Sequence, residues 1–156
     1  MNLRVGQGFD IHPFTDEPGR RLMLGGVHVP GRGLRGHSDA DVVCHAVADA
    51  LLGAAGLGDM GTRFPDTDPR LEGADSLNLL AQVAQELGRA WRPFNVDVTV
   101  LAEAPRLAPY CSEMEKRLGG AVGAPVSVKP KRGEGLGALG RAEGIACLAV
   151  VLLGQA

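Results

Sequence analysis

An aspartate and two histidines are the first residues whose types and spacing suggest chemistry. Asp10 and His12 stand two positions apart in the segment GFDIHPF, within a stretch that alternates like a strand. Residues i and i+2 of a strand point to the same face, so this carboxylate and this imidazole should lie side by side. The pair could ligate a metal, act as a catalytic pair, or form an ion pair at a strand end.

His45 adds a third possible ligand. It lies in a segment expected to be helical, four residues after Asp41, and so shares a helix face with that aspartate. Two imidazoles and one carboxylate with an open position are the donor set of a catalytic zinc rather than of a closed structural zinc. Spacing alone leaves a plainer interpretation open, in which His45 is a hydrogen-bonded polar residue and Asp10 and His12 form a strand-end pair. His28 has the pattern of an ordinary strand residue.

A long acidic segment follows the expected helix. Residues 56–75 are rich in Gly, Pro and Asp and show no periodicity, which predicts a surface loop without regular structure. Loops of this length in a small domain are commonly functional. Asp59 lies between glycine-rich residues, and Asp66 and Asp68 alternate with prolines in FPDTDP. Because Asp and Pro are ordinary turn residues, this motif alone is also typical of a turn.

Strands and helices that must position these residues alternate along the chain. Strands are expected at Leu3–Phe9, within Arg21–Pro30 with a break at Gly25-Gly26, at Asn95–Ala104, at Pro125–Pro130 and at Ile145–Leu153. Helices are expected from Ser38 to about Ala55, from Asp75 or Ser76 to about Leu87, and from Pro105 to about Leu118. A glycine-rich connection fills residues 131–144. This order predicts one α/β (α+β) domain over residues 1–156, with a single sheet and helices packed on one face.

The last predicted strand, Ile145–Leu153, has no polar side chain and is expected to be fully buried. Helices on one side of a single sheet leave its other face bare, so we expect that face to pack on another copy of the chain.

Composition excludes several function classes. The net charge is −2 and no charge block is present, so neither a nucleic-acid tail nor a membrane patch is indicated. The three cysteines, Cys44, Cys111 and Cys147, form no CxxC motif and are expected to be reduced thiols in packed positions. The longest apolar run is too short for a membrane helix, and the N-terminus lacks the pattern of a signal peptide. A cytoplasmic protein is therefore expected.

Six segments in order together resemble one known family. They are GQGFDIHPF, LGGV, GHSDADVVCHAVADALLGAAGLGDMGTRFPDTDP, GADS, EAPRLAPY and GRAEGIA, and they span nearly the whole chain. The set is similar to the 2-C-methyl-D-erythritol 2,4-cyclodiphosphate synthases of non-mevalonate isoprenoid biosynthesis. These lyases convert 4-diphosphocytidyl-2-C-methyl-D-erythritol 2-phosphate to the cyclic diphosphate and CMP, by attack of the 2-phosphate on the β-phosphate. The resemblance implies a homotrimer with active sites between subunits.

The resemblance also implies roles for particular residues. It makes Asp10, His12 and His45 the ligands of one Zn²⁺ per subunit, with Mg²⁺ or Mn²⁺ bridging the substrate diphosphate. It gives catalytic roles to His37 and to the position of Arg132. Residues 59–61 and 64–68 would hold the methylerythritol phosphate, and residues 102–108 the cytidine bound to the adjacent subunit. Arg141 and Glu143 would lie near the three-fold axis. The implied substrate-contacting residues are Asp10, Ile11, His12, His37, Ser38, Asp59, Met60, Gly61, Phe64, Pro65, Asp66, Thr67, Asp68, Ala102, Glu103, Ala104, Pro105, Arg106, Leu107, Ala108, Lys131, Arg132, Gly133, Glu134, Ala138 and Arg141.

One segment departs from the family pattern. Where the family usually has three threonines and a glutamate after the Val-Lys strand, this chain reads KPKRGEG and keeps only Glu134. Arg132 takes the place of a threonine that orients phosphate in the family, and Ala138 stands where phenylalanine is common. Our hypothesis is that Lys131 or Arg132 contacts the diphosphate directly, since charge-assisted hydrogen bonds are stronger than those of a hydroxyl. The alternative is that both side chains point to solvent.

Two other functions use the same residues. A zinc phosphohydrolase would use an attacking water, and it would release a free phosphate instead of a cyclic product. A non-catalytic, zinc-stabilised trimer would only bind nucleotide or isoprenoid. The intact ligand set and the acidic FPDTDP loop argue against a pure scaffold. Neither a nucleic acid nor a membrane is expected as a partner.

Overall fold

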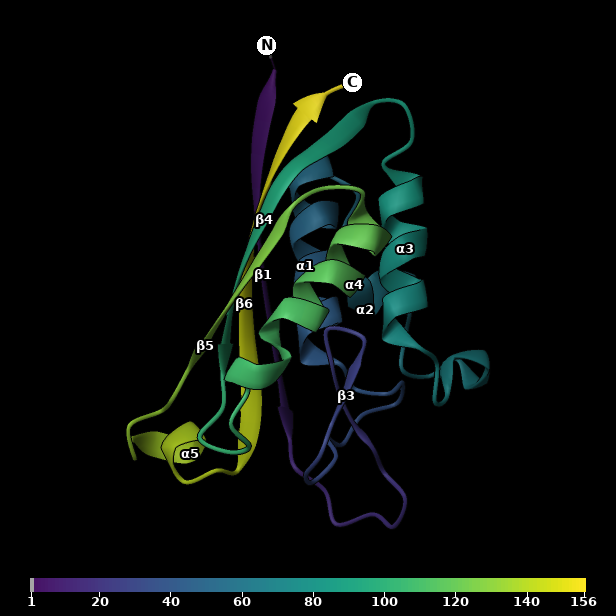
Figure 1. Cartoon of the computed structure of the whole chain (residues 1–156). Coiled ribbons are helices and arrows are strands. Elements are labelled where there is room, and N and C mark those ends of the chain that lie inside the picture. Colours follow the sequence, from purple (N-terminus) through teal and green to yellow (C-terminus); the bar gives the residue numbers. More distant parts are fainter. Residues whose placement is uncertain (1) are drawn as a thin grey trace.

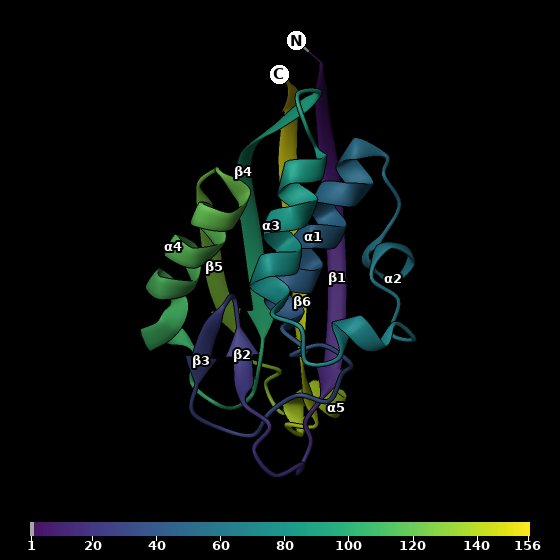
Figure 2. The same cartoon turned by 90° about the vertical axis from the view of Figure 1, so that its right-hand side faces the viewer.

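A computed structural model describes residues 2–156 as a sheet covered by helices on one face (Figure 1). The strands lie in the order β1-β6-β4-β5. Their bounds are β1 (Leu3–Pro13), β4 (Trp91–Leu101), β5 (Val126–Lys131) and β6 (Gly144–Gln155), and β2 (Leu22–Leu24) pairs with β3 (Val27–Val29) in a separate hairpin. The covering helices are α1 (Val42–Ala55), α3 (Ser76–Glu86) and α4 (Cys111–Val122), seen in front of the sheet in Figure 2.

Strand directions bring several chain segments to one end of the sheet. β6 runs antiparallel to both β1 and β4, and β5 runs parallel to β4. β1, β4 and β5 therefore share one direction and finish at the same end. β1 and β5 are also the two edge strands. The loops that follow them lie at opposite edges of that end.

Two glycines let α1 lie unusually close to β1. Gly6 and Gly8 are buried on the face of β1 that also carries Asp10 and His12. A Cβ atom at Gly8 would overlap the carbonyl oxygen of Ala46, and one at Gly6 would overlap that of Ala50. This close backbone approach brings His45 of α1 beside Asp10.

The prediction that this helix begins at Ser38 is wrong, because α1 begins at Val42 with Asp41 as its N-cap. The buried Asp41 carboxylate accepts hydrogen bonds from the N–H groups of Val43 and Cys44, and also from two glycine N–H groups in the β2–β3 turn. Ala40 has a φ of 56°, a left-handed conformation that cannot continue a helix. The two glycine N–H groups of the hairpin turn therefore favour Asp41 over Ser38 as the N-cap.

Four further expectations are corrected. Residues 56–75 contain short helices, α2 (Met60–Arg63) and η1 (Pro69–Leu71), and the expected connection 131–144 contains α5 (Gly137–Gly140). The helix expected from Pro105 begins at Cys111 after η2 (Ala108–Tyr110), because a proline at 109 would clash with the carbonyl of residue 105 in a continuous helix. β4 also starts four residues before the predicted Asn95, at Trp91.

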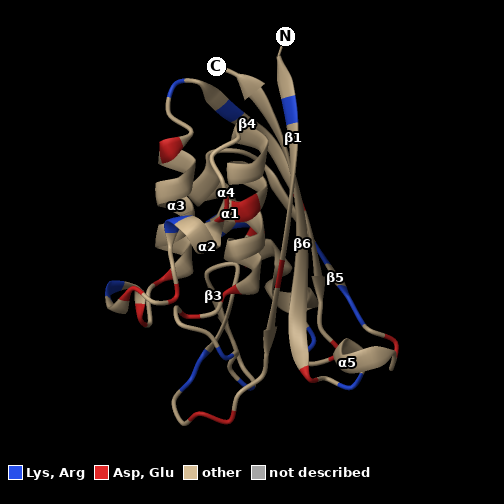
Figure 3. Ribbon diagram, turned by 180° about the vertical axis from the view of Figure 1, so that it is seen from behind, with Lys and Arg blue, Asp and Glu red and all other residues tan. Residues whose placement is uncertain are grey.

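The sheet face opposite the helices carries apolar side chains from β1 and β6. Val5 and Phe9 of β1 are 69 % and 50 % exposed, and Leu148 and Val150 of β6 are 39 % and 43 % exposed. The expected full burial of the last strand thus fails in one chain, because its residues alternate between the helix-covered face and this open face. Figure 3 shows β6 without charge along its length, whereas β5, on the far side of β4, carries lysines. None of the helices in residues 2–156 has the length and apolar composition needed to cross a membrane.

Candidate metal and substrate site

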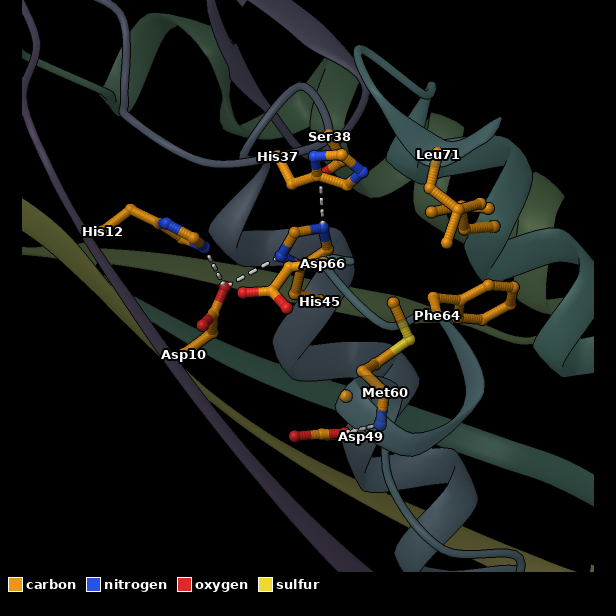
Figure 4. A pocket seen from close by; sticks show the side chains of 12 residues that line it. Asp10, His12, His37, Ser38, His45, Asp49, Met60, Phe64, Asp66 and Leu71 are labelled. Atoms are coloured by element: carbon orange, nitrogen blue, oxygen red, sulfur yellow. Dashed lines mark hydrogen bonds and ion pairs between the residues drawn. The ribbon is translucent and has the colours of Figure 1, made fainter. Parts of the chain in front are cut away.

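Asp10, His12 and His45 converge at the end of β1 (Figure 4). Asp10 Oδ2 lies 3.1 Å from His12 Nε2 and 3.0 Å from His45 Nδ1. One donor atom from each residue lies within 4.8 Å of the other two. Four ligands at zinc–nitrogen and zinc–oxygen bond lengths would be about 3.3 Å apart in a tetrahedron. The separations and the donor types therefore fit a divalent metal ion bound by three protein ligands.

The second nitrogen of each histidine is held by a partner outside this cluster. His12 Nδ1 lies 2.8 Å from the Arg35 carbonyl oxygen, to which it donates. His45 Nε2 lies 2.8 Å from Ser76 Oγ. These contacts direct Nε2 of His12 and Nδ1 of His45 toward Asp10. Outer hydrogen bonds of this kind orient imidazole ligands at metal sites.

The electrostatics of the cluster favour an ionised carboxylate. Burial alone would raise the pKa of Asp10, but hydrogen bonds and charge interactions with His12 and His45 outweigh it and hold the pKa well below its usual range. Burial would lower the pKa of His12, but the hydrogen bond and charge of Asp10 raise it overall. An anionic oxygen flanked by two imidazoles is thus ready for a cation in place of protons.

Arg20 stabilises the turn over residues 34–38, which carries His37 and Ser38. Its guanidinium donates to the carbonyl oxygens of Leu34 at 2.8 Å, Gly36 at 2.9 Å and Ser38 at 2.5 Å. Because three carbonyl groups share one rigid fork of donors, this turn is fixed before the helix begins. These hydrogen bonds also hold the neighbouring Arg35 carbonyl, which accepts from His12.

A cavity of about 430 Å³ opens beside the ligand cluster. It is lined by Asp10, His12, His37, Ser38, His45, Asp49, Met60, Gly61, Phe64, Asp66, Leu71 and Leu79. Nine of these were predicted as site residues, and Figure 4 shows most of them around the same space. Polar groups gather near the ligands, and apolar side chains from α2, η1 and α3 line the rest.

Asp49, Leu71 and Leu79 were missed by sequence reasoning. Asp49 lies one helical turn after His45, so the i, i+4 relation could have indicated it. Its Oδ1 accepts a hydrogen bond from the Met60 N–H at 2.7 Å, which ties α1 to α2. Burial raises the pKa of Asp49.

The carboxylates of the acidic loop have different roles. Asp66 lines the cavity, whereas Asp68 caps η1 and pairs with Arg70 at 2.8 Å. The hydrogen bonds from Arg70 lower the pKa of Asp68 to about 2. Asp59 caps α2 by accepting from the Thr62 N–H. Turn chemistry therefore explains two of the three aspartates.

His37 connects the turn before α1 to the acidic loop. Its Nε2 lies 2.6 Å from the Asp68 carbonyl oxygen and donates to it. The His37 side chain also lines the cavity.

A second cavity of about 460 Å³ lies between the loop after β4 and the end of β5. It is lined by Ala102, Glu103, Pro105, Arg106, Leu107, Ala108, Pro130, Lys131 and Arg132. Glu103 closes one side, since its carboxylate accepts from Arg132 Nη2 and from the Gly133 N–H, each at 2.9 Å. Sequence reasoning did not foresee this pair, which spans 29 residues.

Several predicted substrate residues line neither cavity. The Ile11 side chain projects from the open face of β1, between two ligands on the other face. Arg141 instead pairs with Glu143 at 2.7 Å. The others outside both linings are Asp59, Pro65, Thr67, Asp68, Ala104, Gly133, Glu134 and Ala138. Backbone contacts of these residues with a substrate remain predictions.

Fold and site together define a class: a single-sheet α/β protein with a carboxylate–bis-imidazole metal site at one sheet edge and a second cavity at the other. A model of the YgbB family matches residues 3–154, and the chain belongs to this family. It is 52 % identical to a 2-C-methyl-D-erythritol 2,4-cyclodiphosphate synthase of Bordetella petrii, over all of this chain and 99 % of the relative. It is 55 % identical to the bifunctional enzyme IspD/IspF of Anaeromyxobacter dehalogenans, of which it spans only 40 %.

Solved structures agree with this assignment. The chain superposes on the bifunctional IspDF of Campylobacter jejuni with a TM-score of 0.94 and 38 % identity, covering 99 % of this chain and 43 % of that one. It superposes on a CDP complex of Plasmodium falciparum IspF with a TM-score of 0.82 and 31 % identity, covering 99 % and 97 %. The family resemblance seen in the sequence is confirmed.

Proposed function

We propose that this chain is a 2-C-methyl-D-erythritol 2,4-cyclodiphosphate synthase. It would convert 4-diphosphocytidyl-2-C-methyl-D-erythritol 2-phosphate to the cyclic diphosphate and CMP. The observation that carries the proposal is the convergence of Asp10, His12 and His45 on one cavity, in a chain 52 % identical to a synthase of that name along nearly its full length.

The reaction needs no protein nucleophile. An oxygen of the substrate's own 2-phosphate forms a bond to the β-phosphorus, while the bond from that phosphorus to the oxygen shared with the α-phosphate breaks. The electron pair leaves with that oxygen, so CMP departs and one ring closes. The attacking phosphate is already an anion at pH 7, and the barriers are charge repulsion and ring closure. Positioning and charge neutralisation are what a protein contributes to such a transfer.

The residues of the first cavity divide these tasks. Asp10, His12 and His45 would hold one Zn²⁺, which supplies positive charge to phosphate oxygens when bound. Mg²⁺ or Mn²⁺ would be held mainly by the diphosphate oxygens themselves. His37 and Ser38 lie next to the ligands, where they would hydrogen-bond the phosphates. Met60, Gly61, Phe64 and Asp66, which line this cavity, would surround the methylerythritol and exclude water from the closing ring.

The second cavity would bind the cytidine of a neighbouring subunit's substrate. Residues 102–103 and 105–108 supply its lining together with Pro130, Lys131 and Arg132. The two cavities lie at the same end of the sheet but at opposite edges, so a neighbour's β5 edge beside this β1 edge would join them. Repeating that head-to-tail contact closes a ring. The apolar open face would pack inside a homotrimer, with Arg141 near its axis.

The Lys131–Arg132 segment would contact the substrate's diphosphate. Arg132 is 68 % exposed at its side chain and already oriented by Glu103, so it is held at the cavity rim. We predict that Arg132→Thr raises KM or lowers kcat in a steady-state assay of CMP release. Glu103→Gln, which removes the orienting charge but keeps the shape, should give a smaller effect in the same direction. Unchanged kcat and KM in Arg132→Thr would refute the direct contact.

Product analysis separates the proposed activity from its nearest rival, a zinc phosphohydrolase. The purified chain is incubated with substrate and Mg²⁺, and the products are followed by ³¹P NMR. Cyclisation gives CMP and a cyclic diphosphate in equal amounts, without inorganic phosphate. An open-chain product would instead indicate hydrolysis, either the 2,4-bisphosphate formed with CMP when water attacks the β-phosphorus, or the dephosphorylated substrate formed with inorganic phosphate when water attacks the 2-phosphate. Binding without turnover would indicate a scaffold. A cytoplasmic location is proposed for the enzyme.

A further inference from the structure

A chain of hydrogen bonds leads from His45 away from the metal ligands. His45 Nε2 lies 2.8 Å from Ser76 Oγ, and Ser76 Oγ in turn donates to Asp39 Oδ1. The Ser76 N–H also donates to Asp39 Oδ2 at 3.2 Å. Ser76 is only 1 % exposed, so these partners are not exchanged for water.

The direction of these bonds fixes the proton on His45. A serine hydroxyl has one hydrogen to donate and two lone pairs that accept. Because the Asp39 carboxylate can only accept, the Ser76 hydrogen goes to Asp39 and a lone pair faces His45. His45 therefore carries a hydrogen on Nε2, toward Ser76, and Nδ1, which is directed at Asp10, is the nitrogen whose hydrogen a metal ion would replace. Ser76 and Asp39, neither of which is a metal ligand, thus determine which nitrogen of His45 faces the metal site.

We propose that Ser76 and Asp39 are positioning residues, which hold the His45 ring in the orientation that presents Nδ1 to the metal. The inference rests on the metal site proposed above. It adds residues from the first position of α3 and from the turn before α1, neither of which touches the metal. Removing an outer hydrogen bond of this kind typically weakens metal affinity by about 10- to 100-fold.

The same contacts join the metal ligand to the substrate loop. Ser76 directly follows residues 56–75, and the Asp39 N–H donates to the Ala74 carbonyl oxygen at 3.0 Å. The Gly73 N–H donates to the His37 carbonyl oxygen at 2.8 Å. The end of the loop is therefore fixed to the turn that carries His37, and Ser76 extends that connection to His45.

The two histidine ligands differ in how they are supported. His12 donates to a backbone carbonyl, which no side-chain substitution removes, whereas His45 depends on a side chain. Ser38 Oγ lies 3.2 Å from His45 Nε2 and is a weaker second acceptor. Some support for the ring therefore persists without Ser76, which places the expected loss near the lower end of the range.

The test is the affinity of the metal-free chain for Zn²⁺ alone, measured by titration against a competing chelator. Ser76→Ala should weaken zinc binding about 10-fold or more, and Asp39→Asn should weaken it in the same direction. Circular dichroism confirms that each variant is folded before titration. If Ser76→Ala does not fold, Asp39→Asn decides the question, because asparagine has a similar volume but its amide NH2 can donate, so it no longer fixes the direction of the Ser76 hydroxyl.

Asp75→Ala is the matched control. Asp75 caps the same helix by accepting from the N–H groups of Leu77 and Asn78, but it makes no contact with His45. This variant should melt at a lower temperature than the parent and bind zinc as tightly. Parental zinc affinity in both Ser76→Ala and Asp39→Asn, or an equal loss in Asp75→Ala, would overturn the inference. A parent chain that binds no zinc would instead refute the proposed metal site.

Discussion

Replacing Gly8 with alanine tests how closely α1 must approach β1 to build the site. The added Cβ would overlap the Ala46 carbonyl oxygen and would lie 2.8 Å from the Ala50 nitrogen. Both are backbone atoms of a helix, so no flexible side chain can move aside. The helix must retreat by on the order of 1 Å before these contacts return to van der Waals range. Overpacking of this kind destabilises proteins by about 1–3 kcal/mol, and a rigid backbone neighbour favours the upper end.

The displacement should reach the metal site, because His45 precedes Ala46 and its Nδ1 lies 3.0 Å from Asp10 Oδ2. For a chain of this length, a loss of about 3 kcal/mol corresponds to a melting temperature lower by about 6–12 °C. A ligand displaced by about 1 Å can lower the catalytic rate by about 100-fold. Thermal unfolding, zinc titration and CMP release would record these effects on one protein preparation.

Gly53→Ala is the control on the same helix. A Cβ at Gly53 meets nothing within 4 Å, and the residue lies on the exposed side of α1. This variant should be more stable by roughly 0.5–1 kcal/mol, since alanine favours helix over glycine, and fully active. A Gly8→Ala protein with parental melting temperature and zinc affinity would refute the close packing of α1 on β1.

Two more substitutions test the supports around the site. Asp41→Asn should lower the free energy of unfolding by about 3 kcal/mol in urea titrations, because an amide cannot accept all four backbone hydrogen bonds that the buried carboxylate receives; a change below about 1 kcal/mol would contradict this role. In Arg70→Gln, the pKa of Asp68 should rise from about 2 toward its ordinary value of 3.8, as followed by carboxyl ¹³C NMR. A lowered carboxyl pKa contributes stability above pH 3.8 that is lost as the pH falls toward 2, so this variant should lose less stability over that window. An unchanged pKa would show that Arg70 is not the cause.

The sequence indicates most of the fold because hydrophobic periodicity and turn residues are local signals. The last strand and α3, capped by Asp75, lie close to their predicted bounds, whereas β1 begins at the predicted Leu3 but continues to Pro13, four residues beyond the predicted end at Phe9. The start of α1 was wrong because Ser38 and Asp41 are equally good caps by composition. Only the distant glycine N–H groups of the β2–β3 turn decide for Asp41.

The same distinction between local and distant signals applies to the site. Asp10 and His12 share a strand face by simple alternation, but their meeting with His45 depends on packing that Gly6 and Gly8 permit. Spacing left a metal site as one of several interpretations, and the family resemblance selected it. Contacts between segments far apart in the chain, such as Glu103 with Arg132 or Ser76 with His45, carry no sequence signal of their own.

The most direct test of the account is whether CMP release depends on zinc at the cluster of Asp10, His12 and His45. The metal-free chain is incubated with 4-diphosphocytidyl-2-C-methyl-D-erythritol 2-phosphate and Mg²⁺, before and after zinc is restored, and CMP is measured by mass spectrometry. We expect CMP and the cyclic diphosphate only after zinc is restored, and neither from His45→Ala under the same conditions. Full CMP release without zinc, or none from the zinc-loaded parent, would contradict the account.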